Sequence, residues 1–149
     1  MFIPTIYIEN IKSENKSIEI SGNKLHHLKN VLRIRDEDKI NISNGKGLVF
    51  YGKFANNCVK INNSRMYERQ NSLRIFVPYL REKNRFRFLI EKLTELNVNE
   101  VHIGMTENTQ NTNYNKSKIL DWAISALEQS GSAYLPCLLY TSPSPRDAE

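Results

Sequence analysis

The stretch from Asn84 to Gln110 constrains the fold more than any other part of this chain. Its first half predicts an amphipathic helix, because apolar residues recur there at spacings of three and four while charged residues occupy the other face. The helix is expected to end near Asn97, since asparagine tolerates the left-handed conformation that closes many helices. Val101, Ile103 and Met105 then alternate with other residues as in a short strand. The residues expected on the buried helix face are Phe86, Leu89, Ile90, Leu93 and Leu96.

The segment around this helix and strand has the rhythm of an α/β domain. A strand is expected at Leu73–Val77, a second helix at Lys116–Ser130 closed by Gly131, and the start of a further strand at Tyr134–Leu135. Strands and helices in alternation predict right-handed crossovers in a parallel sheet. Two strands and two helices would leave an open edge and uncovered apolar helix faces, so the sequence predicts a longer native protein. The expected apolar stripe of the second helix is Ile119, Trp122, Ala123, Ala126 and Leu127.

The polar loop Thr106–Asn115 follows the strand of this segment. In open α/β sheets, ligands bind beyond the carboxyl ends of the strands, so the loop lies where function is often found. A simple polar connection is an equally acceptable interpretation of the local pattern.

The first part of the chain predicts a small β-rich module. A helix is expected at Gly22–Arg33, and the Asn44–Gly47 turn predicts a tight hairpin because Asn-Gly favours positive φ at both central residues. A second turn at Asn56-Asn57 completes a meander, which favours a small barrel or half-barrel over a sandwich. The expected strands are Thr5–Glu9, Lys16–Ser21, Asp38–Ser43, Leu48–Ala55 and Cys58–Arg65, and the expected inward residues of the helix are Leu25, Leu28, Val31 and Leu32.

Composition shifts place domain boundaries on this chain. The polar stretch Tyr67–Ser72 separates a first domain, residues 1–68, from a second, residues 73–136. From Cys137 the sequence CLLYTSPSPRDAE changes character, and its Ser-Pro repeats argue against a helix or a central strand. This sequence resembles translated sequencing-adapter read-through, so residues 137–149 are expected to be non-native. A genuine disordered Ser/Pro tail is the alternative.

The composition of the chain limits which kinds of partner and compartment are expected. The net charge of +5 and the pI near 9.2 permit a polyanionic partner without requiring one. No apolar run is long enough to cross a membrane, and the N-terminus has no export signal pattern. Two cysteines, Cys58 and Cys137, lie in unrelated contexts, which predicts a reducing cytoplasm and no metal site.

Basic residues crowd the first helix and its exit. Residues three and four apart share a helix face, so these side chains are candidates for contacts with a phosphate backbone. Solvated charges on the back of a packing helix are the alternative, and locally the favoured one. A second basic group precedes and opens the central helix, where cations oppose the helix dipole and hint at an anionic partner. The first group is Lys24, His26, Lys29, Arg33 and Arg35; the second is Arg74, Arg81, Lys83, Arg85 and Arg87.

No catalytic group stands out from the residues themselves. The sequence has no evident nucleophile–base pair, Cys-x-x-Cys pair or phosphate-cradling glycine loop. The polar cluster Glu128–Gly131 at a helix end could bind a ligand or simply cap the helix. The residues alone therefore predict a two-domain basic protein, a β-rich module followed by the start of an α/β domain.

Three stretches together resemble one family. HHLKNVLRIRDEDKINISNGKG at His26–Gly47, EKLTELNVNEVHIGMTENTQ at Glu91–Gln110 and ALEQSGSAYLP at Ala126–Pro136 are similar to the RsmE family of ribosomal RNA methyltransferases. The resemblance implies an N-terminal PUA-like RNA-binding barrel followed by the first part of a SPOUT α/β domain with a trefoil knot. It also implies a cytoplasmic homodimer that uses S-adenosylmethionine to methylate N3 of a uridine in small-subunit (16S) ribosomal RNA or the assembled subunit.

The resemblance also implies roles for particular residues. Arg33 would contact RNA, and the family's strand-end loop and helix-end motif would lie near the substrate at Thr106, Glu107, Glu128, Gln129 and Ser130. This chain departs from the family at Asn97 and Glu37, where glycine is usual, and at Asn108 and Ser132, where arginine is common. Neither the sequence nor the resemblance identifies a residue that acts as the general base.

The resemblance places the cofactor elsewhere. The glycine-rich loops that hold the cofactor in the family would lie beyond Pro136, so none of these residues is expected to bind it, and this chain is expected to lack activity. The alternative function is a non-catalytic RNA-binding or ribosome-assembly module.

Overall fold

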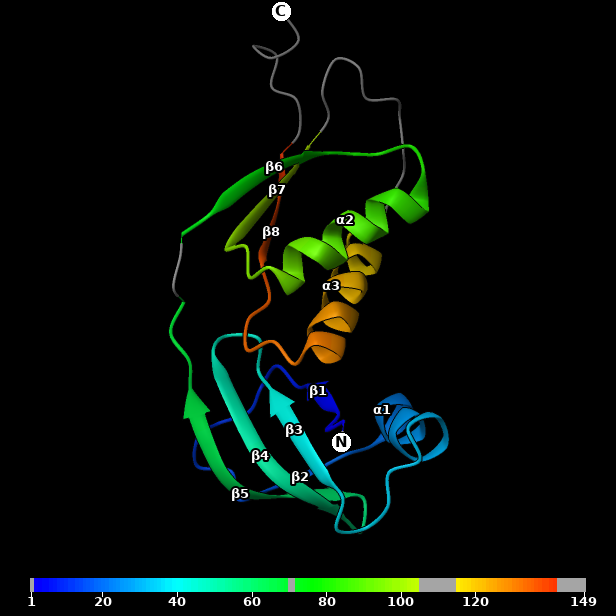
Figure 1. Cartoon of the computed structure of the whole chain (residues 1–149), viewed down its shortest axis with the longest axis vertical. Coiled ribbons are helices and arrows are strands. Elements are labelled where there is room, and N and C mark those ends of the chain that lie inside the picture. The colour runs from blue at the N-terminus through cyan, green and yellow to red at the C-terminus, as the bar shows by residue number, and fades with distance from the viewer. Residues whose placement is uncertain (1, 70–71, 105–114, 142–149) are drawn as a thin grey trace, which may run out of the picture. The chain divides into compact units, whose positions relative to one another are not determined.

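The structure is a computed structural model that describes residues 2–69, 72–104 and 115–141. Its contacts divide the chain into two units. The first unit comprises Met1–Glu68 together with Leu127–Tyr134, and the second comprises Arg69–Ala126 and Leu135–Glu149. The sequence pattern had grouped Leu127–Tyr134 with the second segment. Figure 1 shows the elements of both units, which are described separately below.

The first unit is built on one open five-stranded sheet. Its strands are β1 (Thr5–Tyr7), β2 (Ser17–Glu19), β3 (Lys39–Ser43), β4 (Leu48–Ala55) and β5 (Cys58–Met66). The order is β1-β3-β4-β5-β2, with β1 parallel to β3 and the other neighbours antiparallel. The sheet curls around a core that includes Leu28, Ile40, Ile42, Phe50 and Phe54. The prediction of a small half-barrel is confirmed.

Two turns connect the central strands of this sheet, and both lie at the predicted positions, Asn44–Gly47 and Asn56-Asn57. Between β3 and β4, Gly45 and Gly47 have φ values of 72° and 105°, and the Asn44 side-chain oxygen accepts hydrogen bonds from the backbone N–H groups of Lys46 and Leu48 at 2.8 and 3.0 Å. The positive φ values expected at Asn44 and Gly45 thus fall on Gly45 and Gly47, because the Asn44 side chain organises the loop. The turn at Asn56-Asn57, between β4 and β5, has two left-handed residues, with φ values of 51° and 61°.

The helix of the first unit changes its winding midway. α1 (Gly22–His26) continues into the π-helical turn η1 (His27–Val31), in which the Leu32 N–H donates to the His27 carbonyl at 3.0 Å. The wider turn keeps Leu28 fully buried but leaves Val31 61% exposed and Leu32 37% exposed. The prediction that Val31 and Leu32 face the core is therefore wrong, because it assumed a uniform 3.6-residue period.

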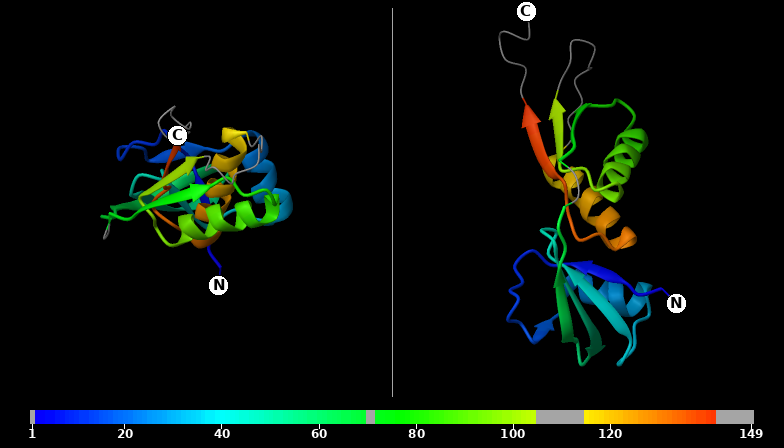
Figure 2. Two further views of the ribbon diagram at one scale, coloured as in Figure 1. Left: turned by 90° about the horizontal axis from the view of Figure 1, so that it is seen from above. Right: turned by 60° about the vertical axis from the view of Figure 1, so that its left-hand side comes forward.

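The second unit alternates strands and helices as predicted. Its elements are β6 (Arg74–Pro78), α2 (Lys83–Glu95), β7 (Glu100–Gly104), α3 (Lys116–Ser130) and β8 (Cys137–Thr141). All three strands are parallel, in the order β6-β7-β8, and the arrowheads of β7 and β8 in Figure 2 point the same way. The last turn of α3, from Leu127, belongs to the first unit.

Strand β8 corrects the sequence-based interpretation of the chain's last part. A strand was expected to start at Tyr134–Leu135 and none was expected from Cys137, yet Cys137–Thr141 pairs in register with β7. The reason is that the first proline of the Ser-Pro run comes only at Pro143, so it removes no hydrogen bond from this ladder. Leu138 and Tyr140 also alternate toward the core of the unit. The expectation that residues 137–149 are non-native stays a prediction.

Aromatic and aliphatic side chains of α2 and α3 form the core of the second unit. Phe86 meets Trp122 edge to face, with ring centroids 5.8 Å apart and planes at 83°, an arrangement that aromatic quadrupoles favour. The predicted stripe of α3 is confirmed, since Ile119, Trp122, Ala123, Ala126 and Leu127 are all buried. On α2 the predicted residues Phe86, Ile90 and Leu93 are buried.

The end of α2 shows how one left-handed residue selects which side chain is buried. Asn97 has φ 60°, as predicted, and the N–H groups of Asn97 and Val98 donate to the carbonyls of Thr94 and Leu93, both at 3.1 Å. This is the Schellman arrangement, in which the residue after the left-handed one turns back to the helix. Val98 therefore enters the core, while Leu96 is 70% exposed and the prediction that it faces inward is wrong.

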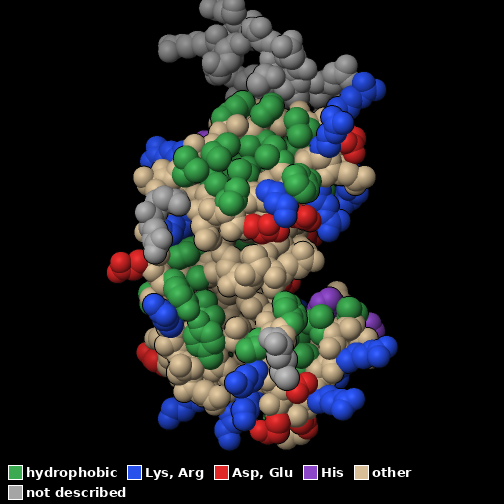
Figure 3. Space-filling model, in the orientation of Figure 1, with side chains coloured by type: hydrophobic (Ala, Val, Ile, Leu, Met, Phe, Trp, Pro, Cys, Tyr) green, Lys and Arg blue, Asp and Glu red, His purple; other side chains and the backbone are tan. Residues whose placement is uncertain are grey.

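The sheet of the second unit is covered on one face. Ile75, Val101, Ile103 and other side chains of that face pack with α2 and α3. The opposite face carries Phe76, His102 and Leu139 in one register row, with Phe76 53% exposed. Figure 3 shows hydrophobic side chains gathered over these strands. Parallel sheets are usually covered on both faces, so the described residues leave one apolar sheet face open, whereas the sequence predicted an open edge and uncovered helix faces.

We predict that Gly52→Ala destabilises the first unit. Gly52 lies at the register irregularity between β4 and β5, where an added Cβ would overlap the Lys60 carbonyl oxygen and lie 3.0 Å from Val59 Cγ1. Relief requires the two strands to separate, which should lower the free energy of unfolding by about 1–3 kcal/mol. Urea titration followed by far-ultraviolet circular dichroism measures the loss, with Ser64→Ala on the exposed part of β5 as the control. Equal midpoints for the two variants would contradict the close approach.

Candidate nucleic-acid interface

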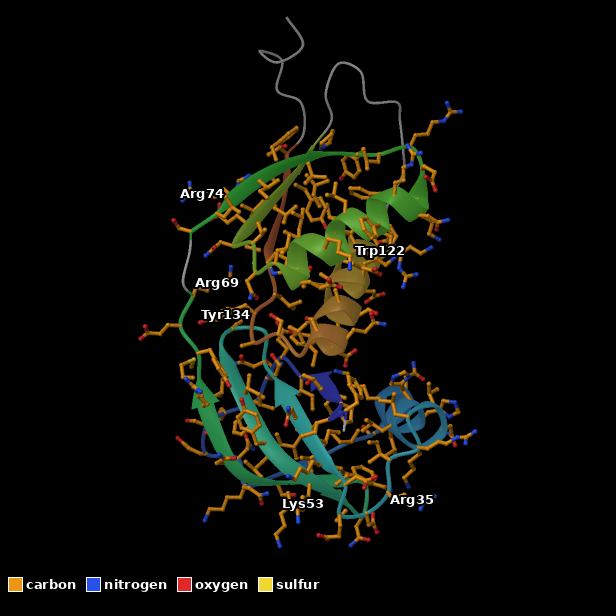
Figure 4. The ribbon with its side chains drawn as sticks, viewed as in Figure 1. Arg35, Lys53, Arg69, Arg74, Trp122 and Tyr134 are labelled. Carbon is orange, nitrogen blue, oxygen red and sulfur yellow. The ribbon has the colours of Figure 1, made fainter. Side chains whose placement is uncertain are left out.

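Three cations predicted to contact RNA lie exposed at η1 and its exit. Lys29 is on η1, Arg33 has φ 54° just beyond it, and Arg35 lies on the loop that leads to β3, where Figure 4 labels it. The left-handed Arg33 has left the helical path, so it does not extend the helix face of Lys29 as the spacing had suggested. The Arg35 backbone N–H donates to Asp38 Oδ2 at 2.8 Å, which fixes the turn while the guanidinium extends from it.

His26 is held in place by its helical neighbour. The Asn30 side-chain amide donates to His26 Nδ1 at 2.8 Å, one turn along the helical segment. These two residues therefore share a face, as their spacing of four implies.

Lys24 differs from the other cations because it takes part in a cluster with Tyr7 and Glu128. Its ammonium lies 5.4 Å from the centroid of the Tyr7 ring, and Glu128 Oε2 accepts the Tyr7 backbone N–H at 3.0 Å. Desolvation lowers the pKa of Lys24, and the nearby Glu128 carboxylate partly opposes that shift. The fold thus brings together a predicted RNA-binding residue and a predicted substrate-proximal residue from positions far apart in the sequence.

The remaining residues of the predicted substrate-proximal group are placed as follows. Gln129 is exposed, and the Ser130 hydroxyl donates to the Leu127 carbonyl at 3.4 Å as α3 ends. Gly131 has φ 68°, the helix terminator that the sequence predicted. Ser132 Oγ accepts the Tyr134 N–H at 3.2 Å and shapes the turn that follows. Thr106, Glu107 and Asn108 lie outside the described residues.

A tyrosine cluster in the first unit was not found from the sequence. The Tyr51 and Tyr67 hydroxyls share a hydrogen bond, and the Tyr134 hydroxyl donates to the Tyr67 carbonyl. The Arg65 guanidinium stacks 4.6 Å above the Tyr67 ring centroid. Burial and the hydrogen bond shared with Tyr67 raise the pKa of Tyr51 to about 12. Local patterns could not reveal the cluster, because its members come from β4, the end of β5 and the segment after α3.

The second unit has a close pair of like charges at its helix starts. Lys83 opens α2 and Lys118 lies in the first turn of α3, and contact with the Lys118 ammonium lowers the pKa of Lys83. The neighbouring arginines differ, since Arg85 and Arg87 pair with Glu82 and Glu91 at 3.0 and 2.7 Å. An anion between the two ammoniums would relieve their repulsion. The basic group predicted at this helix thus contains one element suited to a negatively charged partner.

Neither a membrane nor a metal is indicated by the described parts. In residues 2–69, 72–104 and 115–141 no helix is long and apolar enough to span a bilayer. Within the same ranges no three His, Cys, Asp or Glu side chains gather as metal ligands would.

We predict that Glu128→Gln lowers the pKa of Lys24 further. The glutamine can still accept the Tyr7 N–H, but it removes the negative charge that favours the protonated lysine. A pH titration of the Lys24 side-chain carbon next to the ammonium, followed by NMR, reports the shift. Glu14→Gln, an exposed carboxylate of the same unit, serves as control. An unchanged or higher pKa for Lys24 would refute the proximity of the two charges.

Family models match both parts of the chain. A model described as an RNA methyltransferase PUA domain matches residues 20–55, and one described as an RNA methyltransferase domain matches residues 68–144. The two matches follow one another in the order of the β-rich and α/β elements.

Individual relatives agree with these matches. The ribosomal RNA small subunit methyltransferase E of Buchnera aphidicola subsp. Schizaphis graminum is 29% identical over 109 residues, which cover 66% of this chain and 43% of that protein. A crystal structure of the corresponding enzyme from Neisseria gonorrhoeae, bound to S-adenosyl methionine, has a TM-score of 0.80 at 21% identity and covers 95% of this chain and 62% of that one. A putative methyltransferase from Legionella pneumophila, in complex with the cofactor SAM, has a TM-score of 0.74 at 20% identity over 95% of this chain and 64% of that one.

The chain spans less than half the length of the curated relative and under two thirds of the two solved structures. The match of the RNA methyltransferase domain nevertheless extends over more than half of this chain, from residue 68 to residue 144. The PUA domain match precedes this methyltransferase domain match along the chain. The chain therefore belongs to the RsmE family of ribosomal RNA methyltransferases.

Proposed function

We propose that this chain provides the RNA-binding domain, residues 1–68, and the first part of the catalytic domain, residues 73–136, of an enzyme that methylates N3 of a uridine in small-subunit ribosomal RNA. The observation that carries the proposal is the RNA methyltransferase domain match over the parallel β6-β7-β8 unit. The related enzyme from Neisseria gonorrhoeae binds S-adenosyl methionine, and we propose the same methyl donor for the whole protein.

The chemistry of methyl transfer to uridine N3 sets the requirements that the protein must meet. The donor supplies an electrophilic methyl group, and uridine N3 must lose its proton before it can accept that group. Most of the protein's contribution is therefore to hold the uridine in a fixed orientation and to exclude water around it. In this chain that contribution begins with binding the RNA backbone by the exposed cations Lys29, Arg33 and Arg35 and the partly desolvated Lys24.

The Tyr7–Glu128–Lys24 cluster supports a role near the bound RNA. Glu128 is fixed by the Tyr7 N–H and lies beside the cation Lys24, so its carboxylate has a defined position. We propose that this cluster, with Gln129 and Ser130 beside it, positions RNA. The proposal for Thr106 and Glu107 rests on the family resemblance alone.

The described residues do not fit the methyl donor. The carboxyl ends of β6, β7 and β8 are Pro78, Gly104 and Thr141, and a Cβ on Gly104 would overlap Thr141 Oγ1 and lie 3.2 Å from the Phe76 ring. The strands are packed together at this end, so these residues offer no cradle for a nucleoside. We therefore propose that the chain by itself neither binds the donor nor transfers a methyl group. On the family resemblance alone, we also propose that the working enzyme is a homodimer.

A non-catalytic RNA-binding or ribosome-assembly module is the second candidate. It is favoured by the same contrast, exposed cations on the first unit and no donor cradle among the described residues of the second. Restoring the sequence of a longer relative after Pro136 discriminates the two, because methyl transfer by the restored protein supports the enzyme.

We predict that Lys29→Ala with Arg35→Ala weakens binding to a small-subunit ribosomal RNA fragment. Two lost phosphate contacts should reduce the slope of log affinity against log salt by about 1.4 for a single-stranded region and should lower affinity several-fold at moderate salt. Fluorescence anisotropy at a series of KCl concentrations measures both. Lys12→Ala, an exposed lysine of the same unit, is the control. Identical curves for the double variant and the control would reject this helix segment as an RNA contact.

We predict that the 149-residue chain binds no S-adenosylmethionine at micromolar concentration. The physical reasons are that the family's cofactor-binding loops are expected beyond Pro136 and that Gly104 is packed closely against Thr141 and Phe76 at the described strand ends. Isothermal titration calorimetry of the chain with the donor tests this. A saturable heat with a micromolar dissociation constant would show that the described residues suffice and would overturn the proposal about the donor.

A further inference from the structure

Three lysines stand in one register row across the sheet of the first unit. Lys39 of β3 lies opposite Lys53 of β4, and Lys53 lies opposite Lys60 of β5. Residues directly opposite on neighbouring strands project from the same face, with Cβ atoms about 5 Å apart. The inner face at these strands is occupied by Ile40 and Phe54, which are buried, so the row projects from the outer face.

The row is exposed and almost free of compensating charge. All three lysines are exposed. Of these three lysines, only Lys53 has a carboxylate of the described residues within ion-pair distance, Glu37 Oε2 at 3.7 Å, and that carboxylate is 76% exposed. An exposed pair of this kind contributes little, whereas like charges directly opposite one another are destabilising. The arrangement therefore costs stability in the isolated protein.

The row continues into polar and aromatic side chains on the same face. Asn41, Tyr51 and Asn63 form the next register row, and the Tyr51 hydroxyl is bonded to that of Tyr67. In the next row Ser43 and Val49 are buried and lie outside the core cluster of the inner face, whereas Arg65, opposite Val49, is exposed. The exposed part of the face thus consists of the lysine row, the two amides and tyrosine beside it, and Arg65.

We propose that this outer face of β3, β4 and β5, centred on Lys39, Lys53 and Lys60, is a second binding surface for single-stranded RNA, separate from the cations of α1 and η1. The row is about 10 Å long, two strand spacings, and flexible lysine stems let the ammoniums follow consecutive phosphates of an extended strand. Amides and a tyrosine edge beside a basic groove are suited to unpaired bases. The proposal rests on the RNA-binding part of the proposed function and on none of its chemistry.

The arrangement predicts opposite effects on binding and on stability. Lys53→Gln with Lys60→Gln keeps a polar side chain at both positions, one atom shorter than lysine, and removes the repulsion along the row, so the thermal midpoint of the chain should stay equal or rise. The same variant loses two phosphate contacts, so the salt slope for RNA should fall by about 1.4. A merely structural role for the lysines would move both quantities in the same direction.

The test uses the full chain and a fluorescein-labelled 12-nucleotide oligouridylate, with anisotropy measured between 50 and 300 mM KCl. We expect the Lys53→Gln, Lys60→Gln variant to bind about tenfold more weakly than the wild type at the lowest salt. The matched control, Lys12→Gln with Lys46→Gln, removes two exposed lysines outside the row and should change affinity less than twofold. Unchanged affinity and slope for the row variant would overturn the proposal, as would a loss of affinity for a deca-aspartate peptide without a loss for RNA.

The outcome also separates this inference from the proposed function. If Lys29→Ala with Arg35→Ala weakens RNA binding and the row variant does not, the inference fails and the proposed function stands. If the wild-type chain shows no salt-dependent binding to RNA at all, both fail. If each variant weakens binding and the two effects add in free energy, the chain has two independent RNA contacts.

Discussion

Each sheet in this chain buries one face, and this constraint decides where a partner can bind. Side chains alternate along a strand, so once Ile40, Ile42, Phe50 and Phe54 are committed to the core of the first unit, their neighbours must point away from it. The second unit obeys the same rule, with Val101 and Ile103 facing α2 and α3 and His102 facing outward. The exposed faces are therefore consequences of core packing, and their chemistry differs, basic on the first sheet and apolar on the second.

Helices with a regular period were predictable from the sequence, and backbone irregularities were not. The stripe of α3 follows one period throughout, so all of its predicted residues are buried. The same reasoning wrongly predicted that Val31 and Leu32 are buried, because a π-helical turn changes the helical period within five residues and no local sequence signal marks that turn. The prediction that Leu96 is buried was wrong for a related reason. The left-handed conformation of Asn97 was predicted, but the hydrogen bonds of the Schellman arrangement, which bury Val98 in place of Leu96, were not.

The candidate site shows the same division between local and nonlocal information. Basic residues that lie close together in the sequence can be recognised without a structure, and Lys29 and Arg35 became candidates for RNA contacts in that way. The cluster of Lys24, Tyr7 and Glu128 joins residues more than a hundred positions apart, and the lysine row depends on strand register. Neither can be derived from composition or periodicity, because register is fixed by hairpins and by the bulge near Gly52.

The distribution of repulsion in the two units points to the partner more clearly than net charge does. A charge of +5 is compatible with many functions. Lysines facing lysines are more informative, because a fold that needed only solubility would intersperse acidic residues, as α2 does by pairing Arg87 with Glu91. Lys53 beside Lys39 and Lys60, and Lys83 beside Lys118, retain a repulsion that a bound polyanion would convert into attraction. Like charges held side by side without acidic partners are thus a physical reason, independent of any resemblance to other proteins, to test these positions for polyanion binding.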